Sequence, residues 1–178
     1  SSCVVIPVNL AKKDGEAADV IKSYYRQNMG SGFDLTPYED PVETLTWLND
    51  LSASESATGQ YDRYIGNMGN LSVFHPKIRE FIMAKRERSL PHFNISVDVN
   101  ELFMDSASQD RPYKLADGSE IDAAELLWQM ADSAHRNGDP GIIYLDRINQ
   151  DNPISYHSPY TSTPPCSEMG LASGETCQ

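Results

Sequence analysis

The sequence has 178 residues, 39% of them hydrophobic and 9% aromatic, which is typical of one folded domain with an apolar core. No apolar run approaches the roughly 20 residues that cross a bilayer. The net charge of −12 repels nucleic-acid backbones and anionic membrane surfaces, so we expect neither as a partner.

The predicted elements alternate between strands and helices along most of the chain. In chain order, the pattern predicts a strand at 4–8, a helix at 14–30, a strand at 33–36, a helix at 40–51, a flexible loop at 52–60, a strand at 69–75, a helix at 76–88, a strand at 93–99, a helix at 100–107, a hairpin or loop at 111–120, a helix at 122–138, a strand at 141–145 and a loop-like end at 149–178. This alternation predicts an α/β fold with mostly parallel strands.

The helix at 122–138 carries the clearest signals. Asp122 is expected to cap it, Glu125 follows three residues later, and Gly138 ends it. The segment "MGSGFD" at 29–34 lacks the spacing of a phosphate-binding loop, and we interpret it as the end of the preceding helix. The apolar face of the helix at 122–138 is expected to comprise Leu127, Met130, Ala131 and Ala134.

No repeat and no linker divides the chain, so residues 1–178 are expected to form a single domain. Nothing at the N-terminus has the pattern of a secretory signal, and the three cysteines are too few for a disulfide framework. We therefore expect a cytoplasmic protein. The histidines and cysteines show no metal-ligand spacing, so the sequence predicts no metal site.

The three cysteines stand at the two ends of the chain. Cys3 lies in "SSCVV", and Cys166 and Cys177 lie in "TPPCSEMGLASGETC". Glu168 follows Cys166 by two residues, which places a nucleophile and an acid/base group on the same side of an extended segment. Cysteine is also a common small core residue, so the pattern alone leaves both interpretations open.

Four segments in register resemble a known family. They are "RYIGNMGNLSVFHPKIREFIMAKR", "HFNISVDVNELFM", "NGDPGIIYLDRIN" and "TPPCSEMGLASGETC". In order and spacing they are similar to the catalytic chain of ribonucleotide reductases, most of all the adenosylcobalamin-dependent class II enzymes. That family reads "GANMG", "NFNISV", "GDPGI" and "TNPCGE" at these places. The resemblance implies the first half of a ten-stranded α/β barrel, ending just after the loop that bears the radical cysteine.

The resemblance also implies roles for individual residues. Cys166 matches the cysteine that becomes a thiyl radical and takes the 3′ hydrogen of a ribonucleotide. Glu168 matches the acid/base group at the 3′ hydroxyl. Cys3 and Cys177 match the pair that reduces the 2′ position and becomes a disulfide, and Ser2 matches a residue that touches substrate.

Three departures from the family pattern bear on substrate binding. Pro164 replaces the asparagine whose amide helps to hold substrate. The loop that contacts the base reads "GQYDRYIG" at 59–66, where only Arg63 matches the family's "GGTRRGA". The resemblance also implies that the loops that bind the substrate phosphates belong to the second half of the barrel, outside the matched segments.

The resemblance implies a ribonucleotide substrate, adenosylcobalamin as cofactor and a thioredoxin-like reductant as a further partner. A half barrel is expected to leave strand edges and an apolar sheet face uncovered, so we expect a second half-barrel chain or a second copy as partner. We predict a ribonucleotide reductase-like oxidoreductase that reduces the 2′ position of ribonucleotides. The alternatives are a diverged structural or regulatory subunit without activity, and a radical enzyme with another nucleoside-like substrate.

Overall fold

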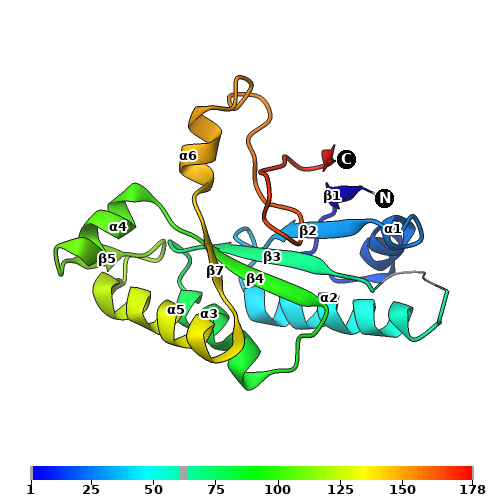
Figure 1. Ribbon diagram of the computed structural model, residues 1–178, viewed down its shortest axis with the longest axis horizontal. Coiled ribbons are helices and arrows are strands. Elements are labelled where there is room, and N and C mark those ends of the chain that lie inside the picture. Colours follow the sequence, from blue (N-terminus) through cyan, green and yellow to red (C-terminus); the bar gives the residue numbers. More distant parts are fainter. Residues whose placement is uncertain (1, 61–63, 178) are drawn as a thin grey trace.

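The computed structural model describes residues 2–60 and 64–177 and contains one large sheet (Figure 1). Its strand order is β7-β4-β3-β2-β1-β8, and β5 and β6 form a separate hairpin. Neighbouring strands of the large sheet are parallel except at β1–β8. The expected α/β fold with mostly parallel strands is confirmed. The strands are β1 (Cys3–Val5), β2 (Gly30–Asp34), β3 (Asn67–Ser72), β4 (Phe93–Asp98), β5 (Pro112–Lys114), β6 (Glu120–Asp122), β7 (Gly141–Ile143) and β8 (Thr176–Cys177).

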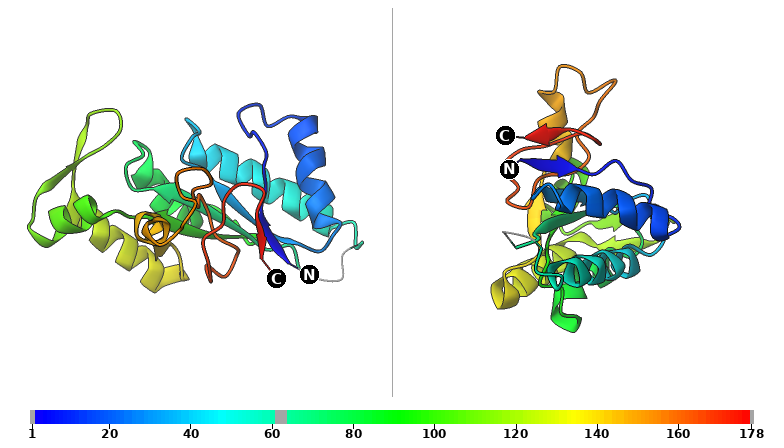
Figure 2. Two further views of the ribbon diagram at one scale, coloured as in Figure 1. Left: turned by 90° about the horizontal axis from the view of Figure 1, so that it is seen from above. Right: turned by 90° about the vertical axis from the view of Figure 1, so that its right-hand side faces the viewer.

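The helices lie mainly on one side of the sheet, and residues 151–175 near the C-terminus lie on the other (Figure 2). None of the helices within the described ranges is long and apolar enough to cross a membrane. Their bounds are α1 (Gly15–Tyr25), α2 (Pro41–Ser56), α3 (Ile78–Glu87), α4 (Glu101–Ser108), α5 (Ala123–Asn137) and α6 (Leu145–Gln150).

The two faces of the sheet differ in chemistry, because strand residues alternate between faces and the register aligns equivalent positions. One face is largely apolar, includes Phe33, Leu71, Phe93, Ile95 and Val97, and belongs to the hydrophobic core. We call the other the inner face. Its central positions are mostly small or polar: Gly30, Gly32, Asp34, Met68, Asn70, Ser72, Asn94, Ser96 and Asp98.

The C-terminal return, residues 151–175, crosses the inner face and leads to β8. Asn70 of β3 holds it through two hydrogen bonds: Asn70 Nδ2 donates to the carbonyl oxygen of Thr161 (3.1 Å), and Ser162 Oγ donates to Asn70 Oδ1 (2.5 Å). A bridge between Ser162 and Leu171 closes the return on itself. The inner face is therefore polar and partly covered, which corrects the expectation of an uncovered apolar face.

Several predicted boundaries were wrong around the first two helices. The first helix ends at Tyr25, and "MGSGFD" supplies strand β2 at Gly30–Asp34 rather than a helix end. The second helix continues through the expected loop to Ser56. Ser52 explains this extension, because its hydroxyl is buried and lies 2.9 Å from the hydroxyl of Tyr25 on α1.

The later elements match the sequence more closely. The hairpin, the Asp122 cap and the left-handed Gly138 at the end of α5 are as predicted. The buried face of α5 comprises Ala123, Leu126, Met130 and Ser133, so the predicted face was displaced by about one residue. Strand β7 was expected to be buried on both faces, but it lies at the sheet edge, where Ile142 is 40% exposed. Helix α6 was not predicted.

Candidate active site

Cys3 and Cys177 face each other across the ladder between β1 and β8. They are direct partners in the antiparallel register, and both are free thiols. Glu168 reaches the same point, and one ligand atom from each of the three residues lies within 4.8 Å of the others. The two ends of the chain thus assemble a cluster of two thiols and a carboxylate, which we call the thiol–carboxylate cluster.

The loop that carries Cys166 and Glu168 is held against the N-terminal ends of the strands. Asn94 Nδ2 on β4 donates a hydrogen bond of 2.8 Å to the carbonyl oxygen of Pro165. The backbone N–H of Ser167 donates to the carbonyl oxygen of Pro164 at 3.0 Å, which closes a turn around Cys166. Cys166 and Glu168 are both exposed on this loop. The arrangement presents a thiol and a carboxylate to solvent from one rigidly anchored turn.

Two glycines of β2 allow the loop to approach the sheet. A Cβ atom on Gly30 would lie 2.8 Å from Cys3 Sγ and 3.0 Å from the ring of Pro165. A Cβ atom on Gly32 would overlap the carbonyl oxygen of Thr163. Both positions therefore need the small hydrogen side chain of glycine. Sequence reasoning missed this role, although a Gly-x-Gly spacing in a strand places both residues on one face.

The thiol of Cys3 is favoured in its protonated form. Burial raises the pKa of Cys3 above its ordinary value, and the negative charges of Cys177 and Glu168 raise it further. A protonated thiol beside a second thiol can provide both a proton and reducing electrons. The electrostatics of the cluster therefore suit reduction at Cys3 better than nucleophilic attack.

The remaining predicted site residues have different placements. Ser2 is half-buried directly before β1 and next to Cys3. Pro164 is buried at the start of the turn around Cys166. Arg63 lies outside the described residues. The structure thus brings Cys3, Cys177 and Glu168 together, with Cys166 in the same loop as Glu168, while the chemical roles of these residues stay predictions. Sequence reasoning also missed Asn70 and Asn94, which anchor the C-terminal return.

A cavity of about 330 Å³ lies at the opposite, C-terminal ends of β2, β3 and β4. Asp34, Asp98 and Asp146 contribute carboxyl groups to its lining. Burial raises the pKa of Asp98 to about 6, and the charges of Asp146 and Asp34 add to this effect. Burial also raises the pKa of Asp34. An acidic lining repels phosphate groups, so this cavity is unsuited to the phosphates of a nucleotide.

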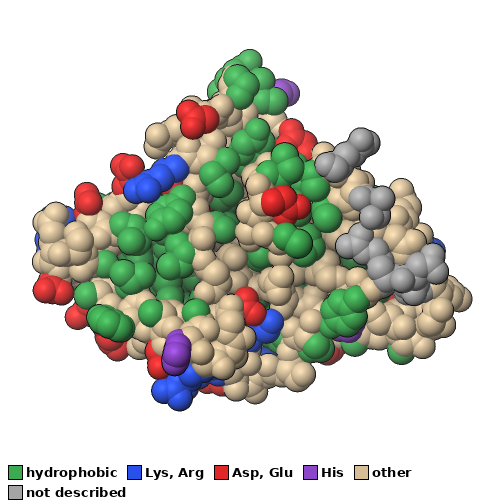
Figure 3. Space-filling view, viewed as in Figure 1, with side chains coloured by type: hydrophobic (Ala, Val, Ile, Leu, Met, Phe, Trp, Pro, Cys, Tyr) green, Lys and Arg blue, Asp and Glu red, His purple; other side chains and the backbone are tan. Residues whose placement is uncertain are grey.

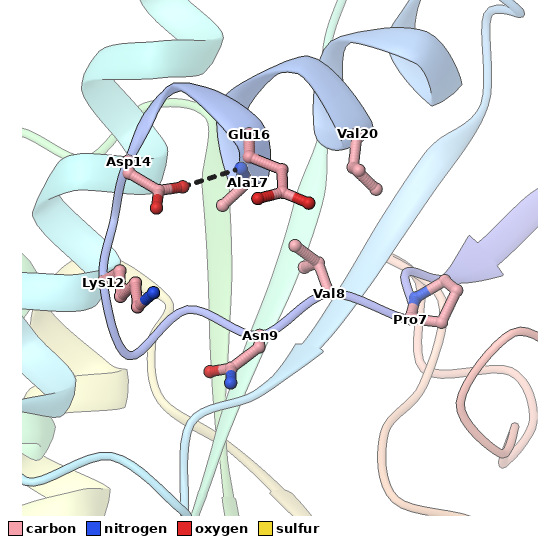
Figure 4. A pocket seen from close by; sticks show the side chains of 8 residues that line it. All are labelled: Pro7, Val8, Asn9, Lys12, Asp14, Glu16, Ala17 and Val20. Carbon is pink, nitrogen blue, oxygen red and sulfur yellow. Dashed lines mark hydrogen bonds between the residues drawn. The ribbon is translucent and has the colours of Figure 1, made fainter.

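A further cavity of about 300 Å³ lies between the segment after β1 and helix α1 (Figure 4). Lys12 and the N-terminus of α1 would attract an anion there. Asp14 and Glu16 oppose it, and Asp14 Oδ1 already accepts a hydrogen bond of 3.0 Å from the N–H of Ala17. The positive N-terminal end of α1 is therefore already capped by the Asp14 carboxylate.

Comparison with known proteins places the chain in one family. Residues 36–178 match the family model described as ribonucleotide reductase, barrel domain. The vitamin B12-dependent ribonucleoside-diphosphate reductase of Thermoplasma acidophilum is 31% identical over 198 aligned positions, covering 99% of this chain and 26% of that protein. The enzyme of the same name from Mycobacterium tuberculosis is 36% identical over 118 positions, covering 62% of this chain and 17% of that protein. The chain therefore spans about a quarter or less of these relatives.

Proposed function

The chain belongs to the ribonucleotide reductase barrel-domain family, and from this premise we propose that it forms the part of a thiyl-radical enzyme that reduces the 2′ position of ribonucleotides. The observation that carries the proposal is the thiol–carboxylate cluster. Two cysteines from opposite ends of the chain and a loop glutamate have ligand atoms within 4.8 Å of one another. A dithiol beside a carboxylate has the groups that such a reduction requires.

In the proposed reaction, Cys166 acts as a thiyl radical and takes the 3′ hydrogen atom of the ribose. Glu168 accepts the proton of the 3′ hydroxyl, which assists loss of the 2′ hydroxyl as water. Cys3 and Cys177 supply two protons and two electrons and become a disulfide. Cys166 then returns the 3′ hydrogen atom, and Glu168 returns the proton to the 3′ oxygen. One ribonucleotide and two thiols thus give one deoxyribonucleotide, water and one disulfide.

The electrostatics of the cluster support this division of roles. The raised pKa of Cys3 keeps its thiol protonated near neutral pH, so it can give a proton to the leaving hydroxyl. The disulfide that forms must be reduced before the next turnover, which requires an external dithiol and a reducing compartment. We therefore propose a thioredoxin-like reductant as partner and a cytoplasmic location.

The proposed cofactor is adenosylcobalamin, which when bound supplies a carbon-centred radical able to take hydrogen from a thiol. The exposed side chain of Cys166 fits this role, because a radical source outside this chain can reach it. The cavities described above measure about 300 and 330 Å³, which suits a small metabolite rather than a corrin. We therefore propose that another part of the protein holds most of the cofactor.

The open edges of the sheet support a partner for this chain. Within the described residues, β7 pairs only with β4, and its Ile142 is 40% exposed. Hydrophobic side chains also gather over α4, β5 and α5 in the space-filling view (Figure 3). A cavity of about 380 Å³ on this side is lined by Leu127, Trp128 and small residues of α4 and α5. We propose that a second half barrel, or a second copy of the chain, covers the edge and this surface.

The experiment combines this chain, joined to or mixed with the rest of the barrel, with adenosylcobalamin, a dithiol reductant and ribonucleotides. Cys166→Ser should abolish deoxyribonucleotide formation, because a hydroxyl does not yield its hydrogen to a carbon radical. Glu168→Gln should slow the reaction by about 10²–10⁴-fold. Cys3→Ser and Cys177→Ser should permit the first hydrogen abstraction, leave the 2′ position unreduced and release base or phosphate from the substrate.

Ser173→Ala is the matched control, because Ser173 is exposed on the same return of the chain. Its turnover should equal that of the unmodified protein. Normal product formation by Cys166→Ser or by either variant of the cysteine pair would contradict the proposed chemistry.

A structural or regulatory subunit is the second candidate, and one observation favours it. Pro164 stands where the family has an asparagine, and a proline side chain has no hydrogen-bonding group with which to hold substrate. The two candidates differ in the effect of Cys166→Ser. A structural subunit would support the activity of a complex equally well with and without this thiol.

A further inference from the structure

We propose that the thiol–carboxylate cluster in its reduced form is a binding site for a thiophilic divalent cation, Zn²⁺ by preference. Cys3, Cys177 and Glu168 each offer one ligand atom, and these atoms lie within 4.8 Å of one another. Zinc binds thiolates at about 2.3 Å and carboxylates at about 2.0–2.2 Å, so tetrahedral coordination needs ligand atoms roughly 3.5–3.8 Å apart. Small side-chain rotations bring the three donors to that separation.

The donor set selects the kind of metal. Two cysteine thiolates favour zinc and other thiophilic ions, whereas sites for magnesium or calcium are built from oxygen ligands. Three protein ligands leave a fourth position open for water, which is the arrangement of zinc sites that remain accessible to solvent. Binding of one cation by both thiols and the carboxylate releases the two thiol protons and places a divalent positive charge between three anionic ligands.

The scaffold around the cluster fixes the two cysteines before any metal arrives. The N–H of Val5 donates to the carbonyl oxygen of Glu175 at 3.2 Å, and the N–H of Gly174 donates to the carbonyl oxygen of Val5 at 2.8 Å. These bonds hold the last strand beside the first. The exposed Glu168 on the neighbouring loop gives a cation access from solvent.

The bound cation and the disulfide exclude each other, because the same two sulfur atoms take part in both. Metal binding would therefore protect the dithiol from oxidation and also occupy the Glu168 carboxylate. This inference goes beyond the proposed reaction, which needs no metal at this position, and it revises the expectation from sequence spacing that no metal site is present. It does not depend on the chain being part of a reductase.

The test is a titration of the reduced chain with Cd²⁺, without nucleotide or cobalamin, followed by the ultraviolet thiolate-to-metal charge-transfer band. We expect one ion per chain, displacement by Zn²⁺, and no band in chain whose Cys3–Cys177 disulfide has been closed. Cys3→Ser and Cys177→Ser should each weaken binding by more than the roughly 10–100-fold that loss of a supporting hydrogen bond costs a metal site. Glu168→Gln should weaken it while one ion per chain is retained.

Cys166→Ser is the matched control for metal binding, because its thiol is free but is not one of the three clustered groups. Its Cd²⁺ affinity should equal that of the unmodified chain. The oxidised chain keeps the native sequence, so its loss of binding cannot come from a substitution that prevents folding. Equal binding by reduced and oxidised chain, or binding lost in Cys166→Ser and retained in Cys3→Ser, would overturn the proposal.

Discussion

Oxidation of Cys3 and Cys177 should join the two ends of the chain and stabilise it strongly. Residues directly opposite in an antiparallel ladder have Cα atoms about 4.5–5.5 Å apart, within the range that disulfides span. The two cysteines occupy such positions. The loop that their disulfide closes includes nearly the whole chain.

The size of the effect follows from the entropy that this loop removes from the unfolded state. The chain-entropy relation gives about 4.7 kcal/mol for a loop of 100 residues and about 5 kcal/mol for one as long as this chain. With a urea dependence of about 2 kcal/mol per M, the unfolding midpoint should rise by about 2.5 M. The slope itself should decrease, because the cross-linked unfolded chain exposes less surface.

The measurement compares urea unfolding of Cys166→Ser chain in its reduced and oxidised forms, so that only the Cys3–Cys177 disulfide can form within one molecule. Cys3→Ser added to Cys166→Ser is the control; it keeps a single thiol and should show no change on oxidation. Mass spectrometry should find the loss of two hydrogens and a peptide that links the two ends. An oxidised chain with the linked peptide but an unchanged midpoint would refute the entropic argument, and absence of the linked peptide would refute the geometry.

Three further predictions concern the sheet and the loop. Gly32→Ala should lower the free energy of unfolding by about 1–3 kcal/mol, because the added Cβ overlaps the backbone of Thr163. Gly15 has open space around it, so the control Gly15→Ala should leave the free energy of unfolding unchanged or slightly higher, as measured by urea unfolding. Asp98 has its pKa raised from 3.8 to about 6 in the fold, so its contribution to stability should fall by about 3 kcal/mol as pH rises from about 3 to about 7. Asp98→Asn should make the fall in stability over this range shallower in pH-dependent unfolding, with the contribution of Asp34 remaining. Ser167 has a φ of 58°, so Ser167→Gly should be about 1 kcal/mol more stable than Ser167→Ala by thermal unfolding.

The sequence predicted elements best where local chemistry and tertiary packing agree. Helix α5 has an aspartate cap and a glycine end, and its limits were found almost to the residue. The prediction for the β2 segment was wrong for the opposite reason. Its two glycines resemble those that end helices, but they are required by the close approach of the C-terminal return, a contact between positions more than a hundred residues apart. No local pattern reports such a contact.

The candidate site was predictable only through the family resemblance. Local spacing connects Cys166 with Glu168, but nothing local connects Cys3 with Cys177. Their meeting depends on β8 adding antiparallel to β1 at the sheet edge. The loop anchored by Asn94 brings Glu168 to the pair, so the three groups that could hold a metal ion come from segments that no sequence spacing connects.

The chemistry of the sheet faces indicates how this chain joins the rest of a barrel. A half barrel with an apolar inner face would gain most of its cohesion by burying that face against the other half. Here the inner face is mostly small and polar, and residues such as Asn70 and Asn94 use it to hold the chain's own return. The apolar side chains lie instead on the helix side and along edge strand β7. The proposed association with the rest of a barrel is therefore expected to use backbone pairing at the sheet edge and packing over α4 and α5, while the inner face holds the chain's own return and the thiol loop.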